Sequence, residues 1–373
     1  MGLKGGKGWR LAALVAAGVA LAAAAPEVTF FSGHVNGQVE GFEKLDVKMF
    51  QARPLPSKLY TEVWFHEMQF REPGIIVIVN VQMHNLGVSS GYCDSYITVS
   101  SPELGYVGDF SSSSPEEVKI DPEGFGISTG AARLELRAGV YRVRFTGKDI
   151  QGDFTYTPLV GSYQQGDGMV RFTKSDEFVR HNFPIPWARI SGRLTVKGKT
   201  RELAGVGSLN HDWQQLSPLR YMSEWRAFWF YTDDATVSMV RASAPDLDGR
   251  WSERLMVAEP GRILFSSHDY TLTELDPAAA PEGGVMLPRR FRVEARAGDD
   301  WLTGEIKVTR VAESKNVLAE YPYLFRKLAE MVADETWSYR FWCDFKFEFH
   351  EDGETRSIAG TGTGNFVNSV KAK

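Results

Sequence analysis

Cysteine is scarce in this chain, which limits how the fold can be held together. The 373 residues include two cysteines, Cys93 and Cys343, and nothing in their spacing demands a disulfide. Cys343 falls on the apolar side of a predicted strand, which favours a buried free thiol. Cysteine and histidine form no cluster with the spacing of a zinc site. The sequence therefore predicts neither a metal nor another cofactor.

An excess of positive charge is also lacking. Lysine and arginine number 42 against 47 aspartates and glutamates, for a net charge of −5. The chain therefore lacks the excess of positive charge that is typical of nucleic-acid-binding proteins. Hydrophobic residues make up 43% and charged residues 24% of the sequence, which indicates a globular protein with room for two domains. The chain has 10 Trp, 13 Tyr and 23 Phe. This suits β-barrels and apolar pockets, although aromatic residues more often form a core.

The N-terminus carries the one long apolar run. Lys4, Lys7 and Arg10 precede apolar residues 11–25, which include an Ala-Ala-Ala triplet at 22–24. An uncleaved membrane anchor is the alternative, but the run is shorter than the ~20 residues that span a bilayer. We therefore expect a signal peptide over residues 1–25 and a periplasmic or secreted protein. The remaining chain has no apolar run long enough to cross a membrane.

Helical periodicity is rare, whereas alternation of apolar and polar residues is frequent. Residues 59–70 and 75–84 form two β runs around a Pro-Gly turn, and residues 339–349 show the cleanest alternation in the chain. The one good helix candidate is residues 322–334. Many strands and one short helix near the C-terminus predict an all-β protein, built as two barrels or sandwiches.

A repeat relates two glycine-rich segments. Residues 198–210 match residues 353–365 at an offset of 155 positions. Chance similarity between turn-rich hairpins is the alternative, because glycine turns recur in β proteins. We favour two related β domains, over residues 26–215 and 216–373, that each end in the same closing hairpin. At this offset His211 corresponds to Phe366, so the polar cluster that begins at His211 exists in the first copy only.

That cluster, Asn210-His211-Asp212-Trp213, is the best candidate site in the sequence. The simpler interpretations are that His211 is a core histidine bonded to backbone, and that Asp212 and Asp233 are turn or loop residues. The Gly-Val-Gly at 205–207 is not a dinucleotide motif, because Asn210 replaces the third glycine and no helix follows.

Residues 175–245 resemble the survival factor type of lipocalin-like proteins. The resemblance rests on His211, Pro218 and Trp225 at intervals of seven, on the Arg-His-Asn-Phe of residues 180–183, on Gly192 and on residues 205–207. It implies two lipocalin-like (calycin) β-barrels in tandem. A wider resemblance is to the carotenoid 1,2-hydratase family, through His-Asp-Trp at 211–213 and Tyr-Thr-Asp at 231–233. Asn210 departs from that family's pattern, which tends to place an acidic residue there.

These resemblances imply binding or transfer of a ceramide-like or isoprenoid-like lipid in a barrel cavity, with transient membrane contact. The alternative is a hydratase or cyclase that protonates an apolar terpenoid or polyketide-like substrate, which needs a carboxyl held protonated in an apolar pocket. A domain without a small ligand is the third alternative. The expected catalytic residues, if the protein is an enzyme, are His211, Asp212 and Asp233. The expected ligand-binding residues are His181, His211, Trp213, Pro218, Trp225 and Tyr231.

Overall fold

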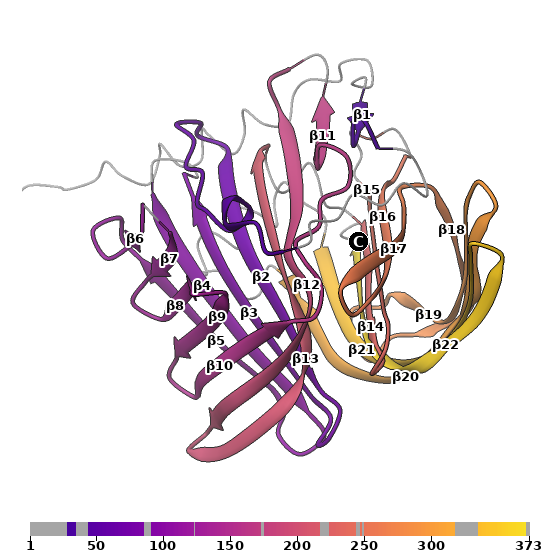
Figure 1. The fold of residues 1–373 in the computed structure, drawn as a ribbon. Helices are drawn as coiled ribbons and strands as arrows, with labels where there is room; N and C mark the ends of the chain where they lie inside the picture. Colours follow the sequence, from indigo (N-terminus) through magenta and orange to yellow (C-terminus); the bar gives the residue numbers. More distant parts are fainter. Residues whose placement is uncertain are drawn as a thin grey trace, which may run out of the picture.

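The chain folds into two curled antiparallel sheets that lie side by side (Figure 1). The computed structural model describes residues 28–34, 44–85, 91–122, 124–172, 175–216, 224–243, 247, 250–317 and 335–370. Strands account for most of them, so the predicted all-β tandem fold is confirmed. The predicted helix at 322–334 and the predicted signal peptide at 1–25 lie outside the described residues. Within the described part of the chain, no helix is long and apolar enough to span a membrane.

The first sheet holds thirteen strands in the order β5-β4-β3-β2-β13-β12-β10-β9-β8-β7-β6, with β11 between β12 and β1. A 3-10 turn, η1 (Val47–Met49), precedes β2. The strands are β1 (Val28–Phe30), β2 (Tyr60–Phe70), β3 (Ile75–His84), β4 (Tyr92–Ser101), β5 (Gly105–Ser113), β6 (Lys119–Ile120), β7 (Phe125–Ser128), β8 (Ala132–Arg137), β9 (Val140–Thr146), β10 (Ile150–Pro158), β11 (Met169–Phe172), β12 (Phe178–Val196) and β13 (Lys199–Gln215).

The second sheet has nine strands in the order β17-β16-β15-β14-β22-β21-β20-β19-β18. They are β14 (Glu224–Tyr231), β15 (Thr236–Ser243), β16 (Ser252–Glu259), β17 (Arg262–Ser267), β18 (Tyr270–Ala279), β19 (Met286–Ala297), β20 (Asp300–Asn316), β21 (Glu335–Glu351) and β22 (Glu354–Val370). In both sheets an early strand pairs with the last strand, β2 with β13 and β14 with β22. The exact domain boundary predicted at residue 216 stays a prediction.

The sequence repeat corresponds to the hairpins β12–β13 and β21–β22. Their turns have the same backbone, with φ of +49° and +78° at Lys197 and Gly198 and of +52° and +84° at Asp352 and Gly353. Two successive positive φ values are the signature of a type I′ hairpin turn, which glycine adopts without strain. The two turns lie 155 residues apart, so each copy of the repeat closes one sheet as expected.

Strand β2 is buried on both faces, and this places it at the centre of the molecule. Tyr60, Trp64 and Met68 point into the core of the first barrel. Alternate residues point the other way, because successive side chains leave a strand on opposite sides. On that side Phe65 stacks on Trp229 of β14, with ring centroids 5.9 Å apart. The outer face of the first barrel thus packs against the second sheet, as the middle of Figure 1 shows.

Aromatic side chains fill the interiors of both barrels in the described part of the chain. The first interior holds Phe50, Phe125 and Tyr141 beside Trp64. The second is packed with phenylalanines, which are Phe228, Phe230, Phe291, Phe341, Phe345, Phe347 and Phe349. Cys343 is completely buried among them, and both cysteines are free thiols, as expected for Cys343.

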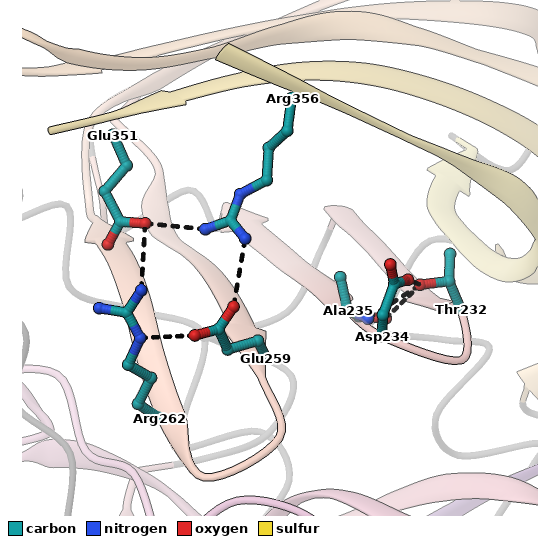
Figure 2. A network of polar contacts seen from close by, with 7 residues as sticks. All are labelled: Thr232, Asp234, Ala235, Glu259, Arg262, Glu351 and Arg356. Atoms are coloured by element: carbon teal, nitrogen blue, oxygen red, sulfur yellow. Dashed lines mark hydrogen bonds and ion pairs between the residues drawn. The ribbon is translucent and has the colours of Figure 1, made fainter. Parts of the chain in front are cut away.

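A ring of four charged side chains connects two hairpins at one end of the second barrel (Figure 2). Arg262 Nε lies 2.6 Å from Glu259, and Arg356 lies 3.1 Å from Glu259 and 2.8 Å from Glu351. Arg262 completes the ring at 3.7 Å from Glu351. The ring joins the tip of β16–β17 to the tip of β21–β22, beside the β14–β15 turn that contains Thr232.

Candidate functional site

The cluster singled out in the sequence is divided between two sides of one strand. His211 and Asp212 are consecutive residues of β13, so their side chains leave the strand in opposite directions. The ring of His211 enters the first barrel, where it bonds to Glu62. The carboxyl of Asp212 points to the other face, where it bonds to His181. The two residues therefore belong to two different environments.

Both ring nitrogens of His211 are held by protein groups. Nδ1 donates to the carbonyl of Met49 in η1 at 2.6 Å, and Nε2 lies 2.7 Å from Oε1 of Glu62. The ring stacks on Trp64, with centroids 4.6 Å apart and planes inclined by 13°. The side chains of His211 and Glu62 are completely buried. His211 thus ties the segment that covers the barrel to the barrel wall.

Glu62 receives further donors on both carboxyl oxygens. The backbone N–H of Arg53 lies 2.9 Å from each oxygen, and the hydroxyl of Tyr60 donates to Oε2. The groups around Glu62 are donors of the kind that a carboxylate accepts, and an acceptor faces each ring nitrogen of His211. His211 and Glu62 therefore form a buried ion pair. Burial and the adjacent Glu62 carboxylate raise the pKa of Tyr60 far above its usual value.

Trp213, two residues after His211, lies between two guanidinium groups. Arg53 stands 5.0 Å and Arg180 4.9 Å from the centroid of its ring. Both distances allow cation–π attraction. Because Trp213 also packs on His211, with centroids 5.2 Å apart, the three residues cover the ion pair.

On the opposite face, His181 and Asp212 form a pair at the junction of the two sheets. Nδ1 of His181 lies 2.9 Å from Oδ1 of Asp212, and the two residues face each other in the β12–β13 register. Burial lowers the pKa of His181, and the positive charge of Arg254 on β16 lowers it further. Burial alone would raise the pKa of Asp212, but the attraction of His181 and Arg254 reverses this and lowers it. Asp212 is therefore an ionised partner in this pair, not a proton donor.

A second set of buried residues occupies the junction between the sheets. Strand β12 and the loop between β10 and β11 pack there against β14, β15, β16 and β17. Trp187 of β12 and Trp229 of β14 are 0% and 2% exposed. We call this set the junction cluster, and its buried members are Val160, Tyr163, Phe183, Trp187, Ala227, Trp229, Tyr231, Val240, Met256, Ala258 and Ile263.

Glu67 and Gln69 of β2 enter the same junction from the first barrel. Oε1 of Glu67 accepts a hydrogen bond from Thr363 of β22 at 2.7 Å. The amide of Gln69 donates to Thr363 Oγ1 at 2.8 Å and to the carbonyl of Trp229 at 2.9 Å. Burial raises the pKa of Glu67 to about 7, although Thr363, Arg340, Gln69 and Tyr231 oppose the shift. A fully buried carboxyl that is half protonated near neutral pH is thus present at the junction.

Several polar atoms at the junction are buried without a hydrogen-bond partner among the described residues. They are the indole nitrogens of Trp187 and Trp229, Oδ1 of Asn210, Oε1 of Gln69 and Oγ of Ser238. Leaving such a group unsatisfied costs about 1–3 kcal/mol, so native structures rarely collect them in one place. Donors and acceptors within an aromatic surrounding are the composition of a small-molecule site.

The residues expected at a site have different positions in the structure. Tyr231 belongs to the junction cluster, and Trp225 packs against it. His181 and Asp212 lie on the junction side, whereas His211 and Trp213 lie on the barrel side. Pro218 lies outside the described residues.

The position of Asp233 bears most directly on the predicted enzyme. Asp233 is exposed in the turn between β14 and β15, so the structure does not bring it together with the buried His211. An exposed aspartate in a turn matches the simpler of its two interpretations. The described residues also contain no group of three or more His, Cys, Asp or Glu that could hold a metal ion.

Sequence reasoning missed Glu62, Glu67 and Trp229. The two glutamates were not singled out because a lone carboxylate in a strand is usually solvent-exposed. One signal was present: residues 60–70 carry two glutamates among large aromatic and apolar side chains that alternate onto both faces of the strand. Such a strand can bury its charges only by pairing them with groups from elsewhere in the chain.

Solved structures with the same fold cover nearly the whole chain. A crystal structure described as AttH from Nitrosomonas europaea superposes with a TM-score of 0.60 at 14% identity, covering 86% of this chain and 98% of that one. CghA with Sch210972 gives 0.60 at 12% identity, with coverage of 91% and 99%. Kievitone hydratase from Nectria haematococca gives 0.56 at 13% identity, with the same coverage.

At these identities the likeness establishes the lipocalin-like fold and leaves the activity open. No curated protein sequence matches the chain. The sequence profile of one family matches residues 104–366, which run from the start of β5 through most of β22. With more than half of its length matched, the chain belongs to the Svf1 family.

Proposed function

We propose that this protein binds a lipid or another largely apolar small molecule at the junction of its two sheets. The observation that carries the proposal is the set of buried, unpartnered polar atoms, led by the indole nitrogens of Trp187 and Trp229, within an aromatic cluster. A ligand with a long apolar body and a few polar groups would match both features. The resemblance of the chain to lipid-carrying proteins supports the same class of ligand.

The junction is favoured over the centre of either barrel because both interiors are occupied. In the first barrel, Phe125 packs on both Trp64 and Tyr141, with ring centroids 6.3 Å and 6.0 Å away, and the three rings belong to the buried core. The one charged pair there, His211 with Glu62, is already satisfied by protein groups. A ligand in the barrel would have to displace these side chains, whose burial stabilises the fold by about 1.5–3 kcal/mol each.

An enzyme of the hydratase or cyclase kind is the second candidate, and Glu67 is the observation that favours it. Protonating a carbon–carbon double bond requires a carboxyl that holds its proton at working pH inside an apolar site. Glu67 meets this requirement, with a pKa raised by burial to about 7. The rings of Trp229 and Tyr231 on β14 would stabilise a developing cation. Asp212, whose pKa is lowered, and the exposed Asp233 meet it less well.

Native mass spectrometry and lipid extraction of the purified protein test the binding proposal. We expect the wild type to retain an apolar molecule and the double variant Trp187→Phe, Trp229→Phe to lose most of it, because phenylalanine keeps the apolar contact but removes the indole N–H. Trp301→Phe is the control, since Trp301 stacks on His350 near the start of β20 and is not part of the junction cluster. A wild type that retains nothing, or a double variant that retains as much as the control, would contradict the proposal.

Glu67→Gln separates binding from catalysis. Glutamine keeps the size and hydrogen bonding of the side chain but cannot donate a proton to carbon. A carrier would keep its ligand in this variant. An enzyme would lose product formation, and with it the deuterium that the wild type incorporates from heavy water into a terpenoid or polyketide-like substrate.

We also propose that residues 1–25 direct export to the periplasm or the medium. N-terminal sequencing of protein recovered from those fractions tests this, with cleavage near residues 22–25 as the expected result. Recovery of the full-length chain from the cell interior alone would contradict it.

A further inference from the structure

Glu67 occupies a position where the two domains meet without solvent. It lies on β2, on the face opposite Trp64, and is 0% exposed. Its hydrogen-bond partner, Thr363, is also 0% exposed and comes from β22 of the second sheet. Together with the two bonds of the Gln69 amide, this contact joins the first barrel to β14 and β22. Ionisation of Glu67 therefore places a charge directly in the domain interface.

The surroundings of Glu67 offer little compensation for that charge. The charged or titratable groups that face it are Arg340 of β21, Tyr231 of β14 and Tyr156 of β10. Burial raises the pKa of both tyrosines well above the usual value, so they remain neutral. Arg340 is the only cation among these groups, and it also lies 3.6 Å from the buried carboxyl of Glu313.

The hydrogen bonds to Glu67 are also incomplete for an ionised carboxylate. Oε1 accepts from Thr363, whereas Oε2 is buried with no hydrogen-bond partner among the described residues. A carboxylate usually accepts several hydrogen bonds when it is buried, because each oxygen has two acceptor sites. Burial therefore favours the neutral acid and outweighs the hydrogen bonds of Thr363, Gln69 and Tyr231, which favour the anion.

We propose that Glu67 makes docking of the two domains depend on pH: the neutral acid holds the junction closed, and the carboxylate loosens it. In an undocked, solvated state the carboxyl would have its ordinary pKa of 4.5, against about 7 when docked. Its contribution to docking is complete below pH 4.5, is lost progressively as pH rises, and is lost fully above pH 7. Between pH 5 and 8 the docking equilibrium would change up to about 100-fold.

Hydrogen exchange measured by mass spectrometry tests this on the full chain, by comparing wild type with Glu67→Gln at each pH. The comparison cancels the intrinsic pH dependence of exchange. We expect peptides of β14 and β22 to exchange at nearly equal rates in the two proteins at pH 4, where the carboxyl is protonated in both states, and at least about tenfold faster in the wild type at pH 8. Peptides of β19, which β21 and β20 separate from β22 in the second sheet, should show no difference at either pH. A ratio within twofold for β14 and β22 at both values would overturn the proposal.

Two further variants keep the test decisive. Thr363→Val removes the hydrogen bond of Thr363 to Oε1, which favours the carboxylate, and so raises the docked pKa alone. The rise in exchange should therefore still begin near pH 4.5 but continue to higher pH than in the wild type, a result that does not depend on whether Glu67→Gln folds. Glu253→Gln is the matched control, because burial also raises the pKa of Glu253 to about 7, but its partner Arg241 belongs to the same sheet. If Glu253→Gln abolishes the pH dependence instead, the assignment to Glu67 is wrong.

The effect of this contact on ligand retention rests on the proposed function, since the ligand is placed at the same junction. The exchange measurement uses protein without added ligand. Failure to retain a lipid would thus contradict the binding proposal but not the pH-dependent docking. An exchange ratio of wild type to Glu67→Gln that does not change with pH would contradict the docking proposal but not the binding proposal.

Discussion

Nε2 of His211 lies 2.7 Å from Oε1 of Glu62, and neither side chain has any exposed surface. Removing one member of such a pair leaves a buried charge without compensation, which costs about 3–5 kcal/mol. We expect His211→Ala to lower the free energy of unfolding by this amount in urea titrations. His350→Ala, which removes a ring at the end of β21 hydrogen-bonded to Thr355, should change it by about 0.5 kcal/mol or less.

The double variant His211→Gln, Glu62→Gln gives the contrasting result. Two neutral amides need no counterion, so the loss should be smaller than the sum of the two single losses. Equal loss in His211→Ala and His350→Ala, or strict additivity in the double variant, would show that the ion pair contributes nothing to the fold.

The organisation of the sheets was predictable because its signals are local. Alternation with a period of two and a Gly turn identify a hairpin from its own residues. The offset of 155 between the two copies then places Lys197-Gly198 on Asp352-Gly353, whose backbone angles agree. The division of the cluster at 210–213 was also predictable in principle, because neighbouring residues of a strand face opposite sides.

The junction was not predictable, because its contacts join residues that are far apart in the chain. Glu67 and Thr363 are separated by 296 positions, and Gln69 and Trp229 by 160. The two glutamates within residues 60–70 indicate only that this strand must pair its charges if it is buried, and no local pattern identifies Thr363 as the partner of Glu67. The polar residues that stand out in the sequence surround His211, which lies on the barrel side. There protein groups already satisfy its ion pair with Glu62.

His66 adds a pH dependence of the opposite sign to that of Glu67. Burial lowers the pKa of His66 to about 4, against an ordinary value of 6.5. Between these two pH values the unfolded chain therefore binds a proton at His66 that the folded chain does not bind. The free energy of unfolding falls as the pH drops from 6.5 towards 4. From pH 7.5 to pH 5 the expected loss from this residue is about 2 kcal/mol.

Urea unfolding of wild type and His66→Gln at both pH values measures this contribution. Glutamine can replace the hydrogen bonds of the ring to Val79 and Tyr141 but does not titrate, so the variant should lose about 2 kcal/mol less on acidification. His350→Gln serves as the control and should follow the wild type. A variant that follows the wild type as closely as the control does would exclude His66 as the source.

Gly207 and Gly362, 155 residues apart, are corresponding positions where each closing strand passes close to the backbone of its neighbour. A Cβ atom would lie 2.1 Å from the carbonyl oxygen of Glu67 at Gly207, and 2.5 Å from that of Trp229 at Gly362. Backbone atoms in a paired strand cannot swing aside, so alanine at either position should cost at least about 1–3 kcal/mol. At Gly360 the nearest contact is the ring of Phe345 at 3.3 Å, so Gly360→Ala should cost less. Thermal unfolding ranks the three variants, and the reverse order would contradict the close approach.

The ion-pair ring of Figure 2 should contribute little and should respond to salt. Arg356 bridges Glu259 and Glu351 but is 43% exposed, and Arg262 is 57% exposed. Exposed pairs of this kind contribute about 0.2–1 kcal/mol and are screened by ions. We expect Arg356→Ala to lower the Tm modestly at low salt and less at about 1 M salt.

Arg356→Lys is the matched variant that keeps the charge of the ring. Lysine cannot present two N–H groups to two carboxylates in the fixed geometry of a guanidinium. It should therefore recover only part of the lost stability, and that part should disappear at high salt. A loss in Arg356→Ala that is large and independent of salt would mean that packing of the arginine stem against Phe349, whose ring centroid lies 5.4 Å from the guanidinium carbon, outweighs the ion pairs.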